Sequence, residues 1–263
     1  MSATPLHVVK VGGAVVENPA ELEAFLDGFA ALDGAKILVH GGGRTATEVA
    51  GRLGVPTRMV AGRRVTDPGM LRVVTMVYAG LVNKTVIASL GKRGVRALGL
   101  CGADLDCIRG QRRPPVDMPG EGMVDFGCVG DVTSVQADAF AGILADGAVP
   151  VVAPLIHDGE GNLLNTNADT IASKLAAGLA AAGYAVTLTF CFEKPGVLSD
   201  PSDDSSVIPV IDPAGFERLL ADGTVSGGMV PKLTGAFSSL KAGVAEVVIT
   251  SASALRGGTR IIP

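Results

Sequence analysis

The sequence predicts an α/β fold with a mainly parallel sheet that is covered by helices on both faces. Apolar runs of strand length alternate along the chain with Ala-rich or amphipathic stretches of helix length. The 36 glycines, against two tyrosines and no tryptophan, favour many tight turns between strands and helices. Strands joined by helices pair in parallel through right-handed crossovers, and ligands of such sheets gather at the carboxyl ends of the strands.

Composition limits the kinds of protein, partner and compartment that fit this sequence. The 263 residues, 48% apolar and 18% charged, can build a well-packed core in one large domain or two lobes. A net charge of −4 argues against nucleic acid or an anionic membrane as a partner. Four cysteines without C-x-x-C spacing predict buried free thiols in a reducing compartment. No apolar run approaches about 18 residues and no signal sequence is evident, which predicts a soluble, cytoplasmic protein.

The first part of the chain alternates strand, glycine turn and helix. Two apolar runs, 6–11 and 36–40, are predicted strands, and each ends directly in a glycine turn. A helix begins between them, because Asn18 is a cap residue, Pro19 takes the first helical position and Glu21 stands in the capping-box place. Its apolar residues follow helical spacing, so one face should pack on the sheet.

Three more elements follow the second glycine turn. A helix over 44–53 ends at Gly54, a typical left-handed cap. Residues 58–66 predict a small projecting hairpin. Asp67-Pro68 then restarts a helix that can run to about Leu90 and is apolar around most of its circumference. Such a helix buries two faces; for the second we prefer a homodimer contact, and a covering layer of the same chain is the alternative.

The second half continues the alternation. Its predicted strands are 95–100, 149–153, 186–191, 247–250 and 260–262, and its predicted helices are 137–144, 170–177, 216–220 and 233–240. Between residues 104 and 131 the chain is rich in Gly, Pro and charge, which predicts one or two short surface hairpins. The arginines there, Arg109, Arg112 and Arg113, could approach an anionic ligand, although solvated surface is the better interpretation.

One polar stretch concentrates side chains that can fix a ligand. Asn165, Asn167 and Asp169 stand at every second position between an apolar strand and a predicted helix. In an extended segment this spacing aims all three side chains at the same face. The alternative is structural: Asp169 caps the following helix and the asparagines hold a turn.

The glycine turns and two lysines indicate anion chemistry. Gly12-Gly13 and Gly41-Gly42-Gly43 let backbone N–H groups approach an anion, and the helix after the second turn adds a partial positive charge. Lys10 lies inside an apolar strand, and Lys232 lies in a glycine-rich approach to a helix. Together with Asp169 they suggest phosphoryl transfer, although neither a P-loop nor a G-x-G-x-x-G motif is present.

These segments resemble, in order and over essentially the whole chain, the amino-acid kinase family. The match is closest to its members that phosphorylate N-acetyl-L-glutamate in arginine biosynthesis. The motifs, specific jointly, are Lys10-Val11-Gly12-Gly13, His40-Gly41-Gly42-Gly43, Gly62-Arg63-Arg64-Val65-Thr66, Asn83-Lys84, Gly130-Asp131-Val132, Asn165-Thr166-Asn167-Ala168-Asp169 and Gly228-Met229-Val230-Pro231-Lys232.

The resemblance implies a three-layer α/β/α sandwich, with an acyl-glutamate lobe over 1–178 that carries a dimer helix, and an ATP lobe over 179–263. It implies catalysis by Lys10 and Lys232, held in place by Asp169. The implied acceptor ligands are Gly42, Gly43, Arg64, Asn165 and Asn167. The implied nucleotide ligands are Gly12, Gly13, Glu193, Gly196, Val197, Leu198 and Ser226. Mg²⁺ would arrive with ATP and be held largely by phosphates, without a dedicated cluster of protein ligands.

Two departures from the family pattern bear on the substrate and on regulation. Phe192-Glu193 stands where better-known members carry Ser-Asp, as in a bacterial subgroup in which some pathways use N-succinyl-L-glutamate. The chain starts almost at its first strand, whereas arginine-inhibited hexameric members carry an extra N-terminal helix, so we expect neither feedback inhibition nor a hexamer. Two rival functions stay open: a kinase of the same fold that acts on aspartate, glutamate, carbamate or UMP, and a non-catalytic metabolite-binding module.

Overall fold

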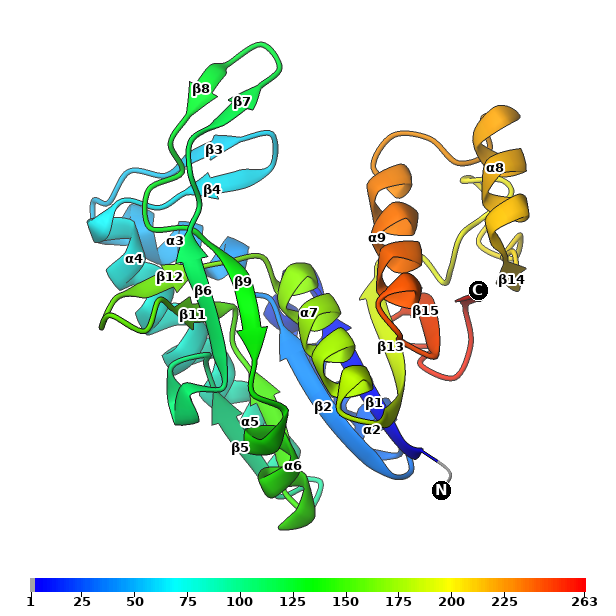
Figure 1. Cartoon of the computed structure of the whole chain (residues 1–263), viewed down its shortest axis with the longest axis horizontal. Coiled ribbons are helices and arrows are strands. Elements are labelled where there is room, and N and C mark those ends of the chain that lie inside the picture. The colour runs from blue at the N-terminus through cyan, green and yellow to red at the C-terminus, as the bar shows by residue number, and fades with distance from the viewer. Residues whose placement is uncertain (1–2) are drawn as a thin grey trace. The chain divides into compact units, whose positions relative to one another are not determined.

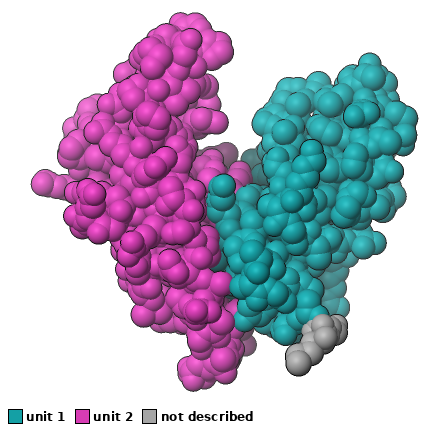
Figure 2. Space-filling view, in the orientation of Figure 1, with its two compact units in different colours: residues 1–38, 172–263 teal, residues 39–171 magenta. Residues whose placement is uncertain are grey.

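The computed structural model describes residues 3–263, which form two compact units. Unit 1 combines the chain up to residue 38 with residues 172–263, and unit 2 comprises residues 39–171 (Figure 2). Contacts therefore group the first strand with the C-terminal part of the chain, whereas the predicted lobes follow chain order. The assignment of one ligand to each lobe stays a prediction.

Unit 1 is built on a mainly parallel sheet. Its strands lie in the order β14 (Val210–Ile211), β16 (Thr259–Ile261), β15 (Glu246–Ser251), β13 (Tyr184–Phe192), β1 (Thr4–Val11) and β2 (Ala35–His40), the last of which ends in unit 2. The β1–β13, β13–β15 and β14–β16 pairs are parallel, whereas β15–β16 is antiparallel. The helices are α1 (Gly13–Glu17), α2 (Pro19–Ala30), α7 (Ala168–Ala181, which begins in unit 2), α8 (Pro213–Ala221) and α9 (Met229–Lys241).

Unit 2 contains a parallel strand pair, β5 (Ala97–Leu100) with β10 (Val149–Val152), and a separate four-stranded sheet. The latter has the order β12 (Leu163–Asn165), β11 (Leu155–His157), β6 (Ile108–Arg112) and β9 (Gly130–Val135). Two hairpins complete the strands: β3 (Arg58–Val60) with β4 (Arg63–Val65), and β7 (Val116–Met118) with β8 (Gly122–Val124). The helices are α3 (Gly43–Arg52), α4 (Pro68–Val74), η1 (Thr75–Val82), α5 (Asn83–Gly91), η2 (Asp104–Asp106) and α6 (Ala137–Ala145).

Helix starts follow the predicted cap chemistry. The Asn18 Oδ1 atom accepts hydrogen bonds from the Ala20 and Glu21 backbone N–H groups, at 3.1 and 3.3 Å. The Asp67 carboxylate accepts from the Met70 N–H at 2.7 Å. Each cap is followed by a proline, which lacks the N–H that a first helical residue would leave without a partner. Both predicted helices are confirmed.

The helix over residues 68–91 is continuous but changes its winding. Its middle segment, η1, is a π-helix between two α-helical segments. By length and composition this 24-residue helix could cross a membrane, although a core helix of a soluble protein meets the same test. The sequence predicted this helix but no membrane-spanning segment, because a few polar residues interrupt its apolar runs. Met76 and Leu81 leave 54% and 56% of their surface exposed.

The two hairpins of unit 2 share a small core. Val60 of β3 packs with Val124, Phe126 and Val129, which follow β7 in the chain. Figure 1 shows both hairpins at the same end of the unit. The hairpin predicted over 58–66 is therefore confirmed, and so is a second hairpin within 104–131. Their shared core orients β4, which carries Arg64.

Some short elements differ from the prediction. The glycine turn after β1 leads at once into the five-residue helix α1, which local preference disfavours because it starts with glycine and contains two β-branched valines. All four cysteines are free, but only Cys107 and Cys191 are buried. Cys101 and Cys128 are half-buried, so the expectation of four buried thiols is wrong for these two.

Candidate functional site

A pocket of about 330 Å³ opens in unit 1 at the carboxyl ends of β1 and β13. Its lining residues are Gly12, Gly13, Ala14, Val15, Cys191, Phe192, Glu193, Lys194, Gly196, Met229, Lys232 and Ile249. Four of the seven predicted nucleotide ligands are in this set, and so is the predicted catalytic Lys232. The prediction from parallel topology, that a site lies where strands end, agrees with this position.

Both predicted catalytic lysines of unit 1 lie close to the same aromatic ring. The Lys232 Nζ atom is 3.8 Å from the centroid of Phe192, and the Lys10 Nζ atom is 5.3 Å from it. Lys10 is 7% exposed, and its ammonium lies 3.8 Å from where a Cβ of Gly12 would stand. The structure thus brings together two cations and a glycine turn, an arrangement that suits a polyphosphate. From the sequence, Phe192 is only a departure from the family pattern, and its contact with both lysines is visible only in the structure.

The turn after β13 forms one wall of the pocket. A Cβ at Gly196 would lie 2.8 Å from both Thr259 and Val207, so glycine is required for close approach. The Val197 N–H donates to the Thr259 hydroxyl at 2.8 Å. Val197 and Leu198 are buried at 1% and 7% exposure and do not line the pocket; Ser226 is exposed and also lies outside its lining.

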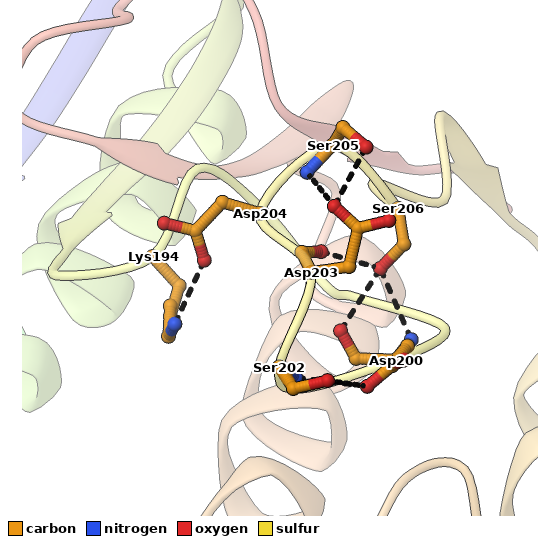
Figure 3. Close-up of polar contacts among 7 residues, drawn as sticks. All are labelled: Lys194, Asp200, Ser202, Asp203, Asp204, Ser205 and Ser206. Carbon is orange, nitrogen blue, oxygen red and sulfur yellow. Dashed lines mark hydrogen bonds and ion pairs between the residues drawn. The ribbon is translucent and has the colours of Figure 1, made fainter.

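The loop beyond this wall is held by its own side chains (Figure 3). Lys194 of the pocket lining pairs with Asp204 at 2.7 Å. Asp200 and Asp203 each accept bonds from the backbone and side chain of the serine two residues later, Ser202 and Ser205. These Asx turns fix the loop without a packed core, and they lower the pKa of both aspartates.

Unit 2 brings Arg64 to the start of a helix. Its Nη2 atom donates to the Gly43 carbonyl and to the Thr47 hydroxyl, both at 2.8 Å, and Nη1 lies 3.8 Å from the Met70 sulfur. Gly43 is the first residue of α3, so a guanidinium and the positive end of a helix dipole lie together. This is the chemistry of a carboxylate site. Of the predicted acceptor ligands, the structure gathers Gly43 and Arg64 here, with Gly42 adjacent.

Glycine is structurally required at position 42. Its φ of 157° is unusual for other residues, and a Cβ would lie 3.2 Å from Tyr78 and 3.3 Å from Val82. The Gly42 carbonyl accepts the Ala46 N–H at 3.1 Å and so begins the hydrogen-bond ladder of α3. The side chains of Tyr78 and Val82 on the long helix therefore lie close to the glycine turn, so a larger residue at position 42 would have to displace them.

The polar stretch at 165–169 differs from the predicted extended segment. The strand ends at Asn165, and α7 begins at Ala168, so the alternation does not reach Asp169. The Asn167 Oδ1 atom accepts the N–H groups of Asp169 and Thr170 at 2.7 and 3.3 Å. The helix cap is therefore Asn167, and the interpretation of Asp169 as the cap is wrong. Asp169 occupies the first turn of α7, where the helix dipole favours a carboxylate.

Asn165 ties the stretch to the hairpin strand. Its amide nitrogen donates to the Thr66 hydroxyl at 2.9 Å, and both residues are buried. Thr66 in turn exchanges backbone hydrogen bonds with Phe126 and Cys128. Thr66 lies two residues beyond Arg64 in sequence, so Asn165 also supports the segment that carries the guanidinium. This link is not predictable from local sequence, because the two partners are 99 residues apart.

The three arginines of 104–131 pair with carboxylates of unit 2. Arg109 binds Asp106 at 2.6 Å, Arg112 binds Asp125 at 2.8 Å and Arg113 binds Asp131 at 2.6 Å. Hydrogen bonding to Arg109 lowers the pKa of Asp106. Arg113 also lies over the Phe126 ring of the hairpin core. Arg109 and Arg112 leave 48% and 61% of their side chains exposed, in line with the preferred interpretation of solvated surface, whereas the Arg113 side chain is only 15% exposed.

A family model described as the amino acid kinase family matches residues 5–251. The chain belongs to this family. Two proteins named acetylglutamate kinase, from Bacteroides fragilis and Bacteroides thetaiotaomicron, are each 55% identical over 258 residues, which is 97% of this chain and 96% and 98% of theirs. Carbamate kinase from Giardia lamblia bound to AMP-PNP has the same fold, with a TM-score of 0.69 at 13% identity over 100% of this chain and 99% of that one. The amino-acid kinase fold predicted from the motifs is confirmed.

Proposed function

We propose that this protein transfers the γ-phosphoryl group of ATP to the side-chain carboxylate of N-acetyl-L-glutamate, forming an acyl phosphate in arginine biosynthesis. The observation that carries the proposal is the 55% identity, over nearly the full length of both chains, with proteins named acetylglutamate kinase. The two sites support it, because one suits a polyphosphate and the other suits a carboxylate.

The pocket of unit 1 is the proposed nucleotide site. The glycine turn after β1 would offer backbone N–H groups, and Lys10 and Lys232 would neutralise charge on the transferring phosphoryl group. Glu193 and Gly196 line the same pocket. Among the described residues no group of three or more His, Cys, Asp or Glu could hold a metal ion. In this proposal Mg²⁺ arrives with ATP, is held largely by phosphate oxygens and would supply further charge neutralisation.

The first turn of α3 is the proposed acceptor site. Arg64 would bind a carboxylate of the acyl-glutamate through its planar fork, and the Gly42–Gly43 turn would add backbone donors. The Gly43 carbonyl and the Thr47 hydroxyl hold the Arg64 guanidinium in place through hydrogen bonds within the protein. Such preorganisation reduces the entropy lost on binding. Asn165 and Asn167 would position the acylamino group, and Asp169 would hold the two lysines during transfer.

The proposed reaction is tested by following ATP consumption with a panel of acceptors. We expect turnover that depends on N-acetyl-L-glutamate, and an acyl phosphate that hydroxylamine traps as the hydroxamate. L-Glutamate, L-aspartate and carbamate should give little turnover. ATP consumption that is indifferent to N-acetyl-L-glutamate, or faster with one of these acceptors, would refute the proposal. An absence of turnover with every acceptor would favour a metabolite-binding module.

The same assay decides the acyl group. A site for N-succinyl-L-glutamate must neutralise a second carboxylate or open it to water, because a buried unpaired charge is costly. Four arginines are candidates for that role: Arg63, Arg109, Arg112 and Arg113. The last three pair with aspartates of unit 2, and Arg63 is exposed on β4. We rank the acetyl compound first because the relatives at 55% identity are named acetylglutamate kinase, and the succinyl compound second. A kcat/KM tenfold higher for the succinyl compound, about 1.4 kcal/mol in transition-state binding, would reverse this order.

We also propose that the protein is a cytoplasmic homodimer. The exposed apolar side chains of the long helix, Met76 and Leu81, favour a contact with a second copy. Neither nucleic acid nor a membrane is expected as a partner, given the net charge of −4.

A further inference from the structure

A buried hydrogen-bond relay connects the long helix to the glycine turn of the acceptor site. His40 ends β2 at 0% exposure, directly before the turn, and Asn83 begins α5 at 1% exposure. We propose that His40 and Asn83 are positioning residues, which hold the Gly41–Gly42 peptide in the orientation that binds the acceptor's carboxylate. This inference rests on the proposed function only for the identity of the acceptor.

The orientation of Asn83 is determined by two neighbours. Its Nδ2 atom lies 3.0 Å from the Val151 carbonyl, which can only accept, so this atom must be the amide nitrogen. Its Oδ1 atom lies 3.1 Å from the Lys84 ammonium, which can only donate. The second hydrogen of the Asn83 amide is therefore left for His40, whose Nε2 atom is 3.1 Å away.

This orientation selects one tautomer of the imidazole. Because Asn83 donates to Nε2, that nitrogen must carry a lone pair. The single ring proton then lies on Nδ1, which donates to the Gly41 carbonyl at 2.7 Å. Burial lowers the pKa of His40 to about 4, and the Lys84 cation acts in the same direction. The ring is thus neutral at pH 7, with both nitrogens satisfied.

The relay acts on the glycine turn through the peptide plane. In a trans peptide the carbonyl and the following N–H point in opposite directions. Holding the Gly41 carbonyl toward the imidazole therefore turns the Gly42 N–H away from it. At the other end of the turn, the Gly42 carbonyl is fixed by the Ala46 N–H. Without the imidazole, a glycine pair could rotate this peptide at little steric cost.

Kinetics of two shape-conserving variants test the relay. His40→Phe removes both ring nitrogens, and Asn83→Leu removes the donor that selects the tautomer. We expect each to raise KM for N-acetyl-L-glutamate about tenfold or more, the scale of a lost buried hydrogen bond, and to change KM for ATP less than twofold. The double variant should be little worse than either single one, since both break the same chain.

Val86→Ala is the matched control. Val86 lies on α5 at 0% exposure, so its truncation leaves a cavity in the same helix but leaves the relay intact. We expect KM for N-acetyl-L-glutamate to stay within twofold of wild type. An increase equal to that of Asn83→Leu would mean that loosening the helix is sufficient, and it would overturn the relay. Additive effects in the double variant would overturn it as well.

The tautomer gives a readout that needs neither a variant at His40 nor activity. In the His7→Gln/His157→Gln protein, one ¹⁵N-labelled imidazole remains. We expect its nitrogen shifts to show a neutral ring protonated on Nδ1 from pH 8 to pH 5. A ring protonated on Nε2, or one that titrates near pH 6.5, would refute the relay. If wild type fails to phosphorylate N-acetyl-L-glutamate, the proposed function fails, and this spectrum still decides the relay.

Discussion

Phe192 is the aromatic residue that lies closest to the two lysines of the pocket of unit 1. Its ring lies within cation–π distance of Lys10 and Lys232, and it stacks on Phe190 with centroids 6.0 Å apart. An aromatic face attracts an ammonium by about 0.5–2 kcal/mol. The Phe192 ring is therefore a neighbour of both cations and can help to hold them in place.

We expect Phe192→Leu to lower kcat/KM for ATP by about three- to thirtyfold, the equivalent of one or two lost cation–π contacts. Leucine keeps apolar bulk but has no ring face. Phe192→Tyr is the control, because it keeps the face and should retain most of the activity. Steady-state kinetics with varied ATP would check both. Equal activity in the leucine and wild-type enzymes would contradict a role for the ring.

The two lysines should act on the chemical step. Lys10→Ala and Lys232→Ala each remove a charge proposed to stabilise the transition state, which commonly costs about 3–4 kcal/mol, or a hundred- to a thousandfold in rate. We therefore expect kcat to fall far more than KM rises. Single-turnover phosphorylation would separate chemistry from binding. A variant with near wild-type kcat would exclude its lysine from phosphoryl transfer.

Arg64 should act on acceptor binding. Its guanidinium serves Gly43 and Thr47 through one nitrogen and has further donors available for a carboxylate. Lysine keeps the charge but lacks the planar fork. We expect Arg64→Lys to weaken binding of N-acetyl-L-glutamate at least tenfold and to leave ATP binding nearly unchanged. Calorimetry with each ligand would measure this, and the reverse pattern would refute the placement.

At the scale of elements, the helix over 68–91 packs some of its side chains against the glycine turn and His40, and it exposes others to solvent. Tyr78 and Val82 lie close to Gly42, and the Asn83 side chain lies 3.1 Å from the His40 ring. Two further residues of the same helix, Met76 and Leu81, are exposed. In the proposed homodimer, this helix would link the contact between the two copies to the proposed acceptor site.

We expect Met76→Glu and Leu81→Glu to dissociate the proposed homodimer, since each places a charge in an apolar contact. Light scattering after size-exclusion chromatography would report the mass. Leu53→Glu is the matched control: Leu53 is 57% exposed and lies at the end of α3, outside this helix. A wild-type protein that is monomeric at micromolar concentration would contradict the expectation from the outset.

At the scale of the whole molecule, His40 couples folding to pH. Burial lowers its pKa in the folded state to about 4, below the value of 6.5 for an exposed imidazole. Between these values the unfolded chain binds more protons, so stability is complete above pH 6.5 and falls as the pH drops toward 4. The loss at and below pH 4 is about 3 kcal/mol, from 1.36 kcal/mol per pKa unit.

Urea unfolding at pH 7 and pH 4.5 would measure this loss. We expect the wild-type free energy of unfolding to decrease by about 2–3 kcal/mol more than that of His40→Phe, which cannot take up the proton. The difference between the two proteins isolates His40 from His7, whose pKa burial also lowers. Parallel pH profiles for both proteins would show that His40 does not contribute.

Local signals were sufficient for much of this molecule. Asn18 and Asp67, each followed by proline, predicted two helix starts because capping depends only on neighbouring residues. Strands with apolar runs, and glycines at their ends, predicted the alternation and the position of the pocket. The motifs carrying Lys10, Arg64 and Lys232 indicated the family without knowledge of the fold.

Tertiary structure decided the features whose partners are distant in sequence. Asn165 meets Thr66 across 99 residues, and Asn83 meets His40 across 43. The two lysines and Phe192 come together only because β1, β13 and α9 belong to one compact unit. The sequence by itself determined which chemical groups are available, because that depends on residue type and local pattern. Only the folded chain decided which groups meet and which imidazole nitrogen holds its proton, because both depend on contacts made across the fold.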